Sequence, residues 1–274
     1  MEIKVIDVSK HQGKIDWAKV KAVGNIDGVI IRCGYGRDIL KQDDERFKEN
    51  ADACIKYGIP FGVYLYSYAK TVDDAKSEAE HVLRLIAPYK DNLSYPVYYD
   101  LEEAGTEKGA VERAIVFGDI IEKNGYWCGI YANQHWWRSY LKSGLNRFTK
   151  WVAKYSSSKP SGISGTYDIW QYSSSGTVAG INGRVDMNIC YRDFPAEIRN
   201  KTVAEVSKYY NKYYGSSGQI DEVFKAIGVP SAYIGKWKNR KAIADANGIS
   251  MYVGTGAQNK KLIELAKQGR LLKV

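Results

Sequence analysis

Short runs of β-branched and aromatic residues recur along the first two hundred residues, and segments with helical periodicity separate most of them. The eight runs cover residues 3–7, 28–33, 61–66, 95–99, 128–131, 150–153, 167–170 and 185–189. Apolar residues at three- and four-residue spacing predict helices at 44–57, 71–86 and 109–124. Strands that alternate with helices predict an α/β fold in which a parallel sheet closes into a β/α barrel.

Two later connections are short and rich in Ser and Gly, at 156–166 and 173–183. Such composition predicts loops, so we expect the last third of the barrel to be irregular. An open doubly wound sheet is the competing fold, but no Gly-rich phosphate loop follows the first strand. An irregular (β/α) barrel is therefore the favoured fold.

Two helix ends are marked in the sequence. Thr71-Val-Asp-Asp74 is a variant of the capping box and predicts a helix start. Gly125 follows the helix predicted at 109–124 and suits a C-cap, because glycine readily takes the left-handed conformation found there.

The barrel pattern stops near residue 200, which predicts a barrel domain at 1–200 and a small α+β domain at 201–274. Helix-like segments cover 203–214 and 220–227. Two similar phrases, Tyr233-Ile-Gly-Lys and Tyr252-Val-Gly-Thr, precede basic helical runs at 239–246 and 258–268. A short strand followed by a helix, twice, is the predicted arrangement, and whether it is a true repeat stays open.

The net charge of +9 lies mostly in this tail. Residues 203–274 hold 12 Lys and Arg against 5 Asp and Glu, a balance of +7, which suggests an anionic polymer as the partner. No apolar stretch approaches the roughly 20 residues of a membrane span, and the N-terminus lacks the apolar core of a signal peptide. We therefore expect a soluble cytosolic product without a membrane partner.

Cysteine and histidine patterns give no sign of a metal site. Cys33, Cys54, Cys128 and Cys190 are widely spaced, so we expect buried free thiols. The histidines, His11, His81 and His135, are too few and too scattered for zinc.

Acidic residues at strand ends carry the strongest sign of chemistry. Asp100 and Glu102 flank Leu101 just after an apolar run, so an extended chain would hold both on one face, roughly 6.6 Å apart. Asp7 and Asp186 also lie at strand ends, and we expect all four at one barrel mouth. Such a cluster can cleave a glycosidic bond, with one carboxyl protonated and one ionised, or it can hold a divalent metal.

Aromatic residues in or beside the strands favour a carbohydrate ligand, because sugars present flat C–H faces that pack on rings while tyrosine also offers a hydroxyl. The set is Tyr64, Tyr66, Tyr98, Tyr99, Tyr131, Trp151, Trp170 and Tyr172. About half of them are expected to fill the core.

Six motifs in order resemble family 25 glycoside hydrolases, the lysozyme-type muramidases of phages and bacteria. They are Asp7-Val-Ser-Lys-His-Gln-Gly13 with Ile15-Asp-Trp17, Gly62-Val-Tyr-Leu-Tyr66, Tyr99-Asp-Leu-Glu102, Gly129-Ile-Tyr-Ala-Asn133, Ile169-Trp-Gln-Tyr172 and Val185-Asp-Met-Asn188. The resemblance spans residues 1 to about 193 and implies an irregular β/α barrel.

The resemblance also implies roles for these residues. Glu102 would be the general acid, and Asp100 would support attack by the substrate's own 2-acetamido group. Asp7 and Asp186 would shape and polarise the site. The residues expected to bind substrate are Tyr64, Tyr66, Tyr131, Trp170, Gln171 and Asn188. The family's substrate is peptidoglycan, cut after N-acetylmuramic acid, and no metal or organic cofactor is implied.

The tail resembles the C-terminal wall-binding modules of endolysins from phages of Gram-positive, especially clostridial, hosts. The phrase from Tyr252 to Ile263 carries this resemblance. It implies that 201–274 binds an anionic or sugar wall polymer, with Tyr233, Trp237 and Tyr252 able to meet sugar rings. The tail could also self-associate. The implied product is a phage endolysin that stays in the host cytoplasm until lysis and then acts on the wall.

Two other functions remain open from the residues. One is a barrel that binds cell wall but has lost activity, against which the presence of all four acids argues. The other is a carboxylate-metal nuclease with a basic nucleic-acid-binding tail. The favoured hypothesis has no nucleic-acid partner, and a chelator would separate the two chemistries.

Overall fold

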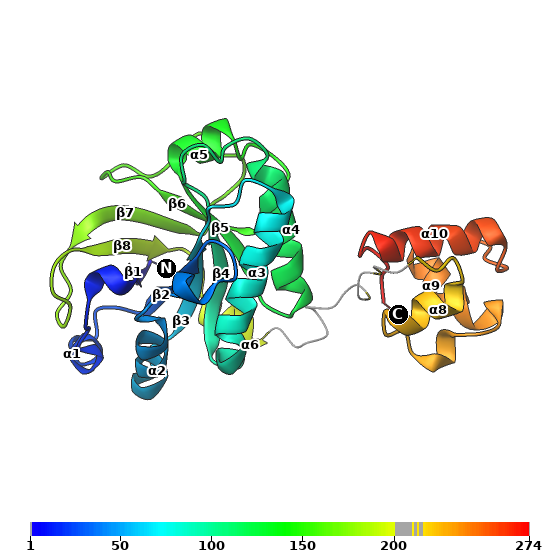
Figure 1. Cartoon of the computed structure of the whole chain (residues 1–274), viewed down its shortest axis with the longest axis horizontal. Helices are drawn as coiled ribbons and strands as arrows, with labels where there is room; N and C mark the ends of the chain where they lie inside the picture. Colours follow the sequence, from blue (N-terminus) through cyan, green and yellow to red (C-terminus); the bar gives the residue numbers. More distant parts are fainter. Residues whose placement is uncertain (1, 201–209, 211–212, 214–215, 274) are drawn as a thin grey trace. The chain divides into compact units, whose positions relative to one another are not determined.

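The chain divides into two compact units, Met1–Asn200 and Lys201–Val274. The structure is a computed structural model, and it describes residues 2–200, 210, 213 and 216–273. Figure 1 shows the strand-rich first unit and the helices of the second. Each unit has its own apolar core.

Eight strands of the first unit form a closed barrel in chain order. They are β1 (Ile3–Val8), β2 (Gly28–Tyr35), β3 (Phe61–Tyr66), β4 (Leu93–Asp100), β5 (Cys128–Asn133), β6 (Thr149–Ala153), β7 (Ile169–Gly176) and β8 (Val185–Cys190). The predicted barrel is thereby confirmed.

The sheet is not parallel throughout, and this corrects the sequence-based expectation. β8 runs antiparallel to both of its neighbours, β1 and β7. The segment between β7 and β8 spans only 177–184, which is shorter than the dozen or so residues that a parallel crossover needs. The expected loop at 156–166 is confirmed, whereas part of the one at 173–183 belongs to β7, which continues to Gly176.

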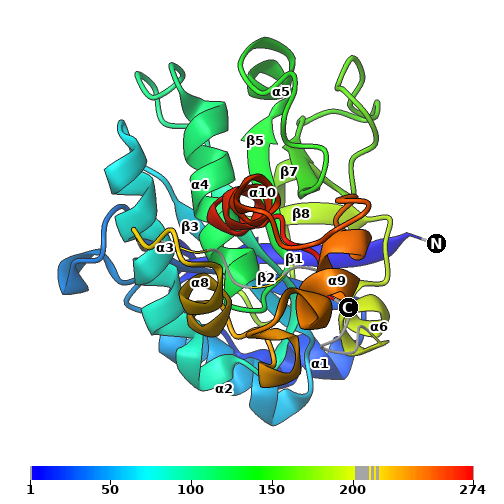
Figure 2. The ribbon, with the colours of Figure 1, turned by 90° about the vertical axis from the view of Figure 1, so that its right-hand side faces the viewer.

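Helices follow most of the other strands. They are α1 (Trp17–Val23), α2 (Phe47–Tyr57), α3 (Val72–Ile86), α4 (Ala110–Lys123), α5 (Gln134–Ser139) and α6 (Phe194–Asn200), with single 3-10 turns η1 (Lys10–Gln12), η2 (Leu40–Gln42) and η3 (Ala87–Tyr89). Figures 1 and 2 show α3 and α4 side by side outside the sheet.

The two helix ends predicted from the sequence are confirmed in the structure. Thr71 and Asp74 form the predicted capping box at the start of α3. Gly125, with φ of 87°, follows α4 and donates its N–H to the Glu122 carbonyl, as a C-terminal glycine should. α2 starts later than expected, because the Asp44 carboxylate accepts the Arg46 N–H ahead of the helix.

Apolar side chains pack against both faces of the sheet. The outer layer lies between strands and helices, and the inner one fills the barrel with Val5, Ile30, Tyr95, Tyr98, Tyr131, Trp151 and Ile169 among others. Gly129 admits the large rings, since a Cβ there would stand 2.3 Å from the Tyr98 ring. The four cysteines are buried free thiols, as predicted.

The described part of the second unit is helical. It contains α8 (Ile220–Ala226), η4 (Ser231–Tyr233), α9 (Trp237–Ala246) and α10 (Gly256–Lys267). The short strands expected near Tyr233 and Tyr252 are wrong, because η4 ends at Tyr233 and Tyr252 lies in an irregular segment. A single bridge residue, Leu272, is the extent of β structure described there. The helix predicted at 203–214 lies outside the described residues, apart from Tyr210 and Tyr213.

The three helices that the structure describes in the second unit share one ending. Gly228, Gly248 and Gly269, each with positive φ, follow α8, α9 and α10. After each glycine, the next N–H bonds back into the preceding helix. A repeated helix-glycine unit therefore replaces the predicted strand-helix unit. Among the described residues of the whole chain, no helix is both long and apolar enough to cross a membrane.

Candidate active site

Four acidic residues from three strands meet at one mouth of the barrel. Asp7 is the penultimate residue of β1, Asp100 ends β4, and Glu102 follows two residues later. Asp186 stands at the start of β8 and pairs in register with Asp7. Because β8 is antiparallel, its start lies where β1 ends. An eight-strand parallel barrel would have put Asp186 at the opposite mouth.

Asp7 is buried in a network of amides. Its Oδ2 accepts hydrogen bonds from Gln171 Nε2 at 2.9 Å and from Asn188 Nδ2 at 2.8 Å. Gln171 lies on β7 and Asn188 on β8, and both are buried. The remaining bond of the Asp7 carboxyl joins it to the Asp186 carboxyl. Two of the predicted substrate-binding residues therefore orient an acid in the free protein.

A hydrogen bond joins the Asp7 and Asp186 carboxyls. Burial, followed by the Asp186 charge, raises the pKa of Asp7 to about 8. Burial also raises the pKa of Asp186, which accepts the hydrogen bond from Asp7. With a pKa of about 8, Asp7 favours its protonated form at neutral pH and can donate to Asp186.

Asp100 and Glu102 lie near each other at the end of β4, close enough for the Glu102 charge to act on Asp100. Leu101 between them is buried in the outer core, and its N–H donates to the Tyr131 carbonyl at 2.9 Å. This extended backbone points its two neighbours to the other face. Asp100 is buried, and its Oδ1 has no hydrogen-bond partner among the described residues.

The pKa values of this pair both move upward. Burial, then the Glu102 and Asp7 charges, raise the pKa of Asp100 well above its usual range, while Arg32 opposes the shift. Burial, then the Asp186 charge, raise the pKa of Glu102, which a hydrogen bond with Tyr131 opposes. The sequence predicted one protonated and one ionised carboxyl. In the structure the pKa values of both Asp100 and Glu102 are raised, so the site favours the protonated form of both.

An aromatic floor lies beneath the acids. The Trp151 ring packs edge-on against Tyr131, Tyr98 and Tyr64, with centroids 4.6, 5.1 and 6.0 Å away. Its indole N–H donates to Asn188 Oδ1 at 2.8 Å. Burial, then the charges of nearby acids that include Asp7 and Asp100, raise the pKa values of Tyr64 and Tyr131, so both rings lie close to the acids. Trp151 fixes the amide that in turn holds Asp7.

Two predicted sugar-binding residues lie further out. The Tyr66 hydroxyl donates to Glu103 Oε2 at 2.9 Å instead of to one of the four acids. Trp170 neighbours Gln171 on β7 and therefore points to the opposite face of that strand. Its indole N–H donates to the Lys154 carbonyl at 2.9 Å.

Two functional residues escaped the sequence reasoning. Arg32 lies on β2, bonds Asp44 at 2.7 Å and is the cation that opposes protonation of Asp100. A charged residue within an apolar strand was the available signal. Tyr155 follows β6, and its hydroxyl donates to Gln171 Oε1 at 3.1 Å, the atom that Tyr131 also contacts. Nothing in the sequence marked it.

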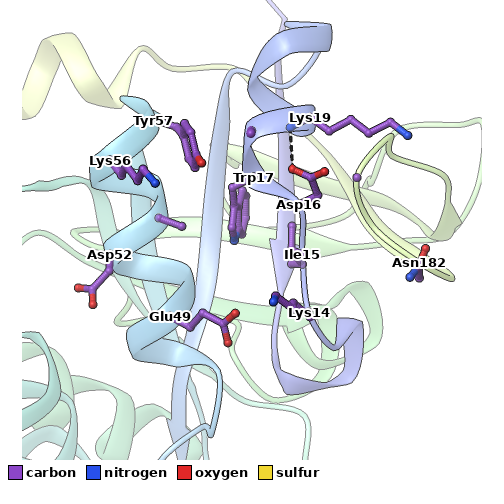
Figure 3. Close-up of a pocket in the computed structure, with 13 residues that line it drawn as sticks. Lys14, Ile15, Asp16, Trp17, Lys19, Glu49, Asp52, Lys56, Tyr57 and Asn182 are labelled. Carbon is purple, nitrogen blue, oxygen red and sulfur yellow. Dashed lines mark hydrogen bonds between the residues drawn. The ribbon is translucent and has the colours of Figure 1, made fainter.

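A cavity of about 860 Å³ lies away from the acids, between α1, α2 and the loop before β8. Figure 3 shows Trp17 and Ile15 in this cavity, with Tyr57 on α2 and Asn182 on the loop. None of the four acids lines it. Within the part of the chain that the structure describes, no group of three or more His, Cys, Asp or Glu is placed to hold a metal.

Known proteins are similar in sequence to the barrel part of this chain. Residues 6–181 match the model of the family described as glycosyl hydrolases family 25. The autolytic lysozyme of Clostridium acetobutylicum is 28% identical over 186 residues, which cover 68% of this chain and 55% of that protein. Lysozyme M1 of Streptomyces globisporus is 27% identical over 207 residues, covering 68% of this chain and 67% of that protein.

Two solved structures have a similar fold. The autolysin LytC of Streptococcus pneumoniae, in complex with a synthetic peptidoglycan ligand, has a TM-score of 0.60 and 34% identity, covering 69% of this chain and 47% of that one. The catalytic domain of an endolysin from a bacteriophage of Listeria monocytogenes has a TM-score of 0.63 and 28% identity, and the match covers 73% of this chain and 98% of that one. The chain thus spans about half the length of the autolytic lysozyme and of LytC.

Proposed function

The chain belongs to family 25 of the glycosyl hydrolases, and we propose that it hydrolyses bacterial peptidoglycan at the β-1,4 bond between N-acetylmuramic acid and N-acetylglucosamine. The observation that carries the proposal is the convergence of Asp7, Asp100, Glu102 and Asp186 at one barrel mouth. Carboxyl groups with raised pKa values, gathered above an aromatic floor, suit cleavage of a glycosidic bond.

Glu102 is the general acid of this proposal. Burial and the Asp186 charge raise the pKa of Glu102 above its ordinary value, which favours the protonated form that donates to the departing glycosidic oxygen. It is also less buried than Asp100, which leaves its carboxyl open to a glycan strand.

Asp100 supports attack by the substrate's own 2-acetamido group. Its Oδ1, buried and without a partner among the described residues, can accept the acetamido N–H and turn the acetamido oxygen toward the sugar carbon. That oxygen forms the new bond to carbon as the glycosidic oxygen leaves with the proton from Glu102. Water then opens the cyclic intermediate, with Glu102 taking the proton back. No metal or organic cofactor enters this scheme.

The remaining site residues hold these groups in place. Asp7 and Asp186 polarise the mouth through the hydrogen bond between them, and Gln171 and Asn188 orient Asp7. Tyr64 and Tyr131 line the inner sugar positions, and Tyr66 serves an outer one. Trp170 is not part of this scheme, because its ring is buried on the opposite face of β7 and its indole N–H donates to the Lys154 carbonyl.

The second unit targets the enzyme to the wall, as in a phage endolysin. The balance of +7 over residues 203–274 favours an anionic wall polymer. Trp237 is 36% exposed and available to a sugar ring, whereas Tyr252 is buried, bonded to Arg240 and Asn259, and so belongs to the core. Wall binding by full-length Glu102→Gln protein should weaken as salt rises, because salt screens exposed charges.

The deciding experiment is mass spectrometry of the products released from purified Gram-positive peptidoglycan after borohydride reduction, with Glu102→Gln as the control. Reduced muramic acid at new ends, absent with the variant, is expected. Reduced glucosamine would reverse the bond assignment, and no new ends would leave a wall-binding protein without activity. Loss of activity in chelator would favour the metal-dependent alternative.

A further inference from the structure

A second cavity, of about 410 Å³, opens beside the acids at the mouth. We call it the β1–β3 pocket, because Lys10, His11, Arg32, Tyr35, Tyr66 and Tyr68 line it and follow or belong to those strands. Its volume lies within the range of about 300–1,000 Å³ that is typical of small-ligand sites. The scheme for bond cleavage uses none of this pocket except Tyr66 at its edge.

Three tyrosine rings form one wall of the pocket. Tyr68 packs edge-on against Tyr35 with ring centroids 6.2 Å apart, and it packs at a tilt against Tyr66 with centroids 5.2 Å apart. The Arg32 guanidinium lies 5.8 Å from the centre of the Tyr35 ring and continues the wall. Tyr68 is 46% exposed, so the outer ring is free to cover an apolar or amide surface.

The charged side chains that line the pocket are the cations Lys10 and Arg32. Among its described lining residues there is no Asp or Glu. Asp44 accepts from Arg32 Nε at 2.7 Å and from the Lys10 backbone N–H at 3.0 Å, so it fixes both residues from behind. Arg32 Nη2 has no hydrogen-bond partner among the described residues.

The Lys10 ammonium is available to a ligand. Its contact is Glu45 at 3.1 Å, and the Glu45 side chain is 76% exposed. An ion pair of this kind contributes little and exchanges readily for another anion.

The pocket adjoins the reacting groups closely enough to receive another part of the same substrate. Tyr66 connects the two, since it lines the pocket and its hydroxyl bonds Glu103, the neighbour of Glu102. Arg32 likewise acts on Asp100 through its charge. The pocket offers cations to an anionic substituent of the glycan and the acid cluster offers none, so the two together fix which way a strand lies.

We propose that the β1–β3 pocket binds the peptide stem of the muramyl residue, with a stem carboxylate on Lys10 and Arg32 and the peptide backbone against Tyr35 and Tyr68. This inference rests on the proposed function. A stem begins at the lactyl group of the same sugar whose bond is cleaved, so it leaves the glycan beside the acids. Recognition of the stem carboxylate selects strands that still carry peptides.

The test is a calorimetric titration of the full chain with N-acetylmuramyl-L-alanyl-D-glutamic acid and, separately, with its diamide. The two probes differ only in that the two carboxylates of the acid are neutral amides in the diamide. Neither contains the scissile bond, so the result does not depend on cleavage. Wild type, Lys10→Met and the matched control Lys142→Met are compared, because Lys142 is exposed outside the pocket and its replacement removes the same charge.

Wild type should bind the acid about three- to tenfold more tightly than the diamide. Lys10→Met should lose most of that preference, and Lys142→Met should keep it. Equal affinity of wild type for acid and diamide, or an unchanged preference in Lys10→Met, would overturn the proposal. Equally tight, Lys10-dependent binding of N-acetylmuramic acid, whose lactyl carboxylate is free, would overturn the assignment to the stem. Product analysis of wild-type protein separately tests the proposed cleavage.

Discussion

Replacing Asp7 by Asn should make the stability of the barrel less sensitive to a rise in pH from about 4 to about 8. In the folded protein Asp7 donates to Asp186 and accepts from Gln171 and Asn188. An asparagine reproduces this pattern, because its amide N–H can donate to Asp186 while its oxygen accepts the same two N–H groups. The substitution therefore imitates the protonated acid and cannot release the proton.

The magnitude follows from the pKa. Asp7 has a pKa of about 8 in the fold against 3.8 as the ordinary value. A folded pKa above the unfolded one gives stability that is fully present below the unfolded value and is lost as pH rises through the folded value. Between these two pKa values, the free energy of unfolding of wild type should thus fall by about 1.4 kcal/mol per pH unit relative to Asp7→Asn. The full difference would reach about 6 kcal/mol.

Urea unfolding followed by tryptophan fluorescence between pH 5 and 9 measures this difference. Six of the seven tryptophans lie in residues 1–200, so the signal reports mainly on the barrel. Asp16→Asn is the matched control, because Asp16 caps α1 from an exposed position and asparagine caps equally well. Wild-type and Asp7→Asn stabilities that change in parallel over this pH range would refute the raised pKa of Asp7.

Three further predictions concern other parts of the molecule. Activity on purified wall should persist to higher pH than an ordinary Glu allows, because the raised pKa of Glu102 keeps its proton longer, and it should decline as pH rises through that pKa. A decline of the pH profile centred near 4.5 would contradict the role of burial. Gly129→Ala should destabilise the barrel by about 1–3 kcal/mol, because the new methyl would stand 2.3 Å from the Tyr98 ring, and urea midpoints unchanged from wild type would show that the ring can move. Tyr252→Phe should destabilise the second unit by about 1–3 kcal/mol, since buried Arg240 Nε loses its acceptor, and an unchanged melting profile by far-ultraviolet circular dichroism would contradict that bond's importance.

The sequence alone determined the barrel and much of its mouth. Side-chain alternation around Leu101 was enough to place Asp100 and Glu102 on one face, because a strand has a fixed period of two. Short-range signals also fixed the start of α3 at the Thr71–Asp74 capping box and the end of α4 at Gly125. These features depend on neighbours in the chain, which a sequence contains.

Only the tertiary structure decided how distant groups meet. The antiparallel direction of β8 brings Asp186 beside Asp7, and the connection before β8 is too short for a parallel crossover only because β7 continues to Gly176 in the structure. Tyr155 and Arg32 join the site through partners far along the chain, whereas Trp170 turns away from Gln171. The pKa values of the acids likewise arise from burial and mutual repulsion, which exist only once the strands close into a barrel.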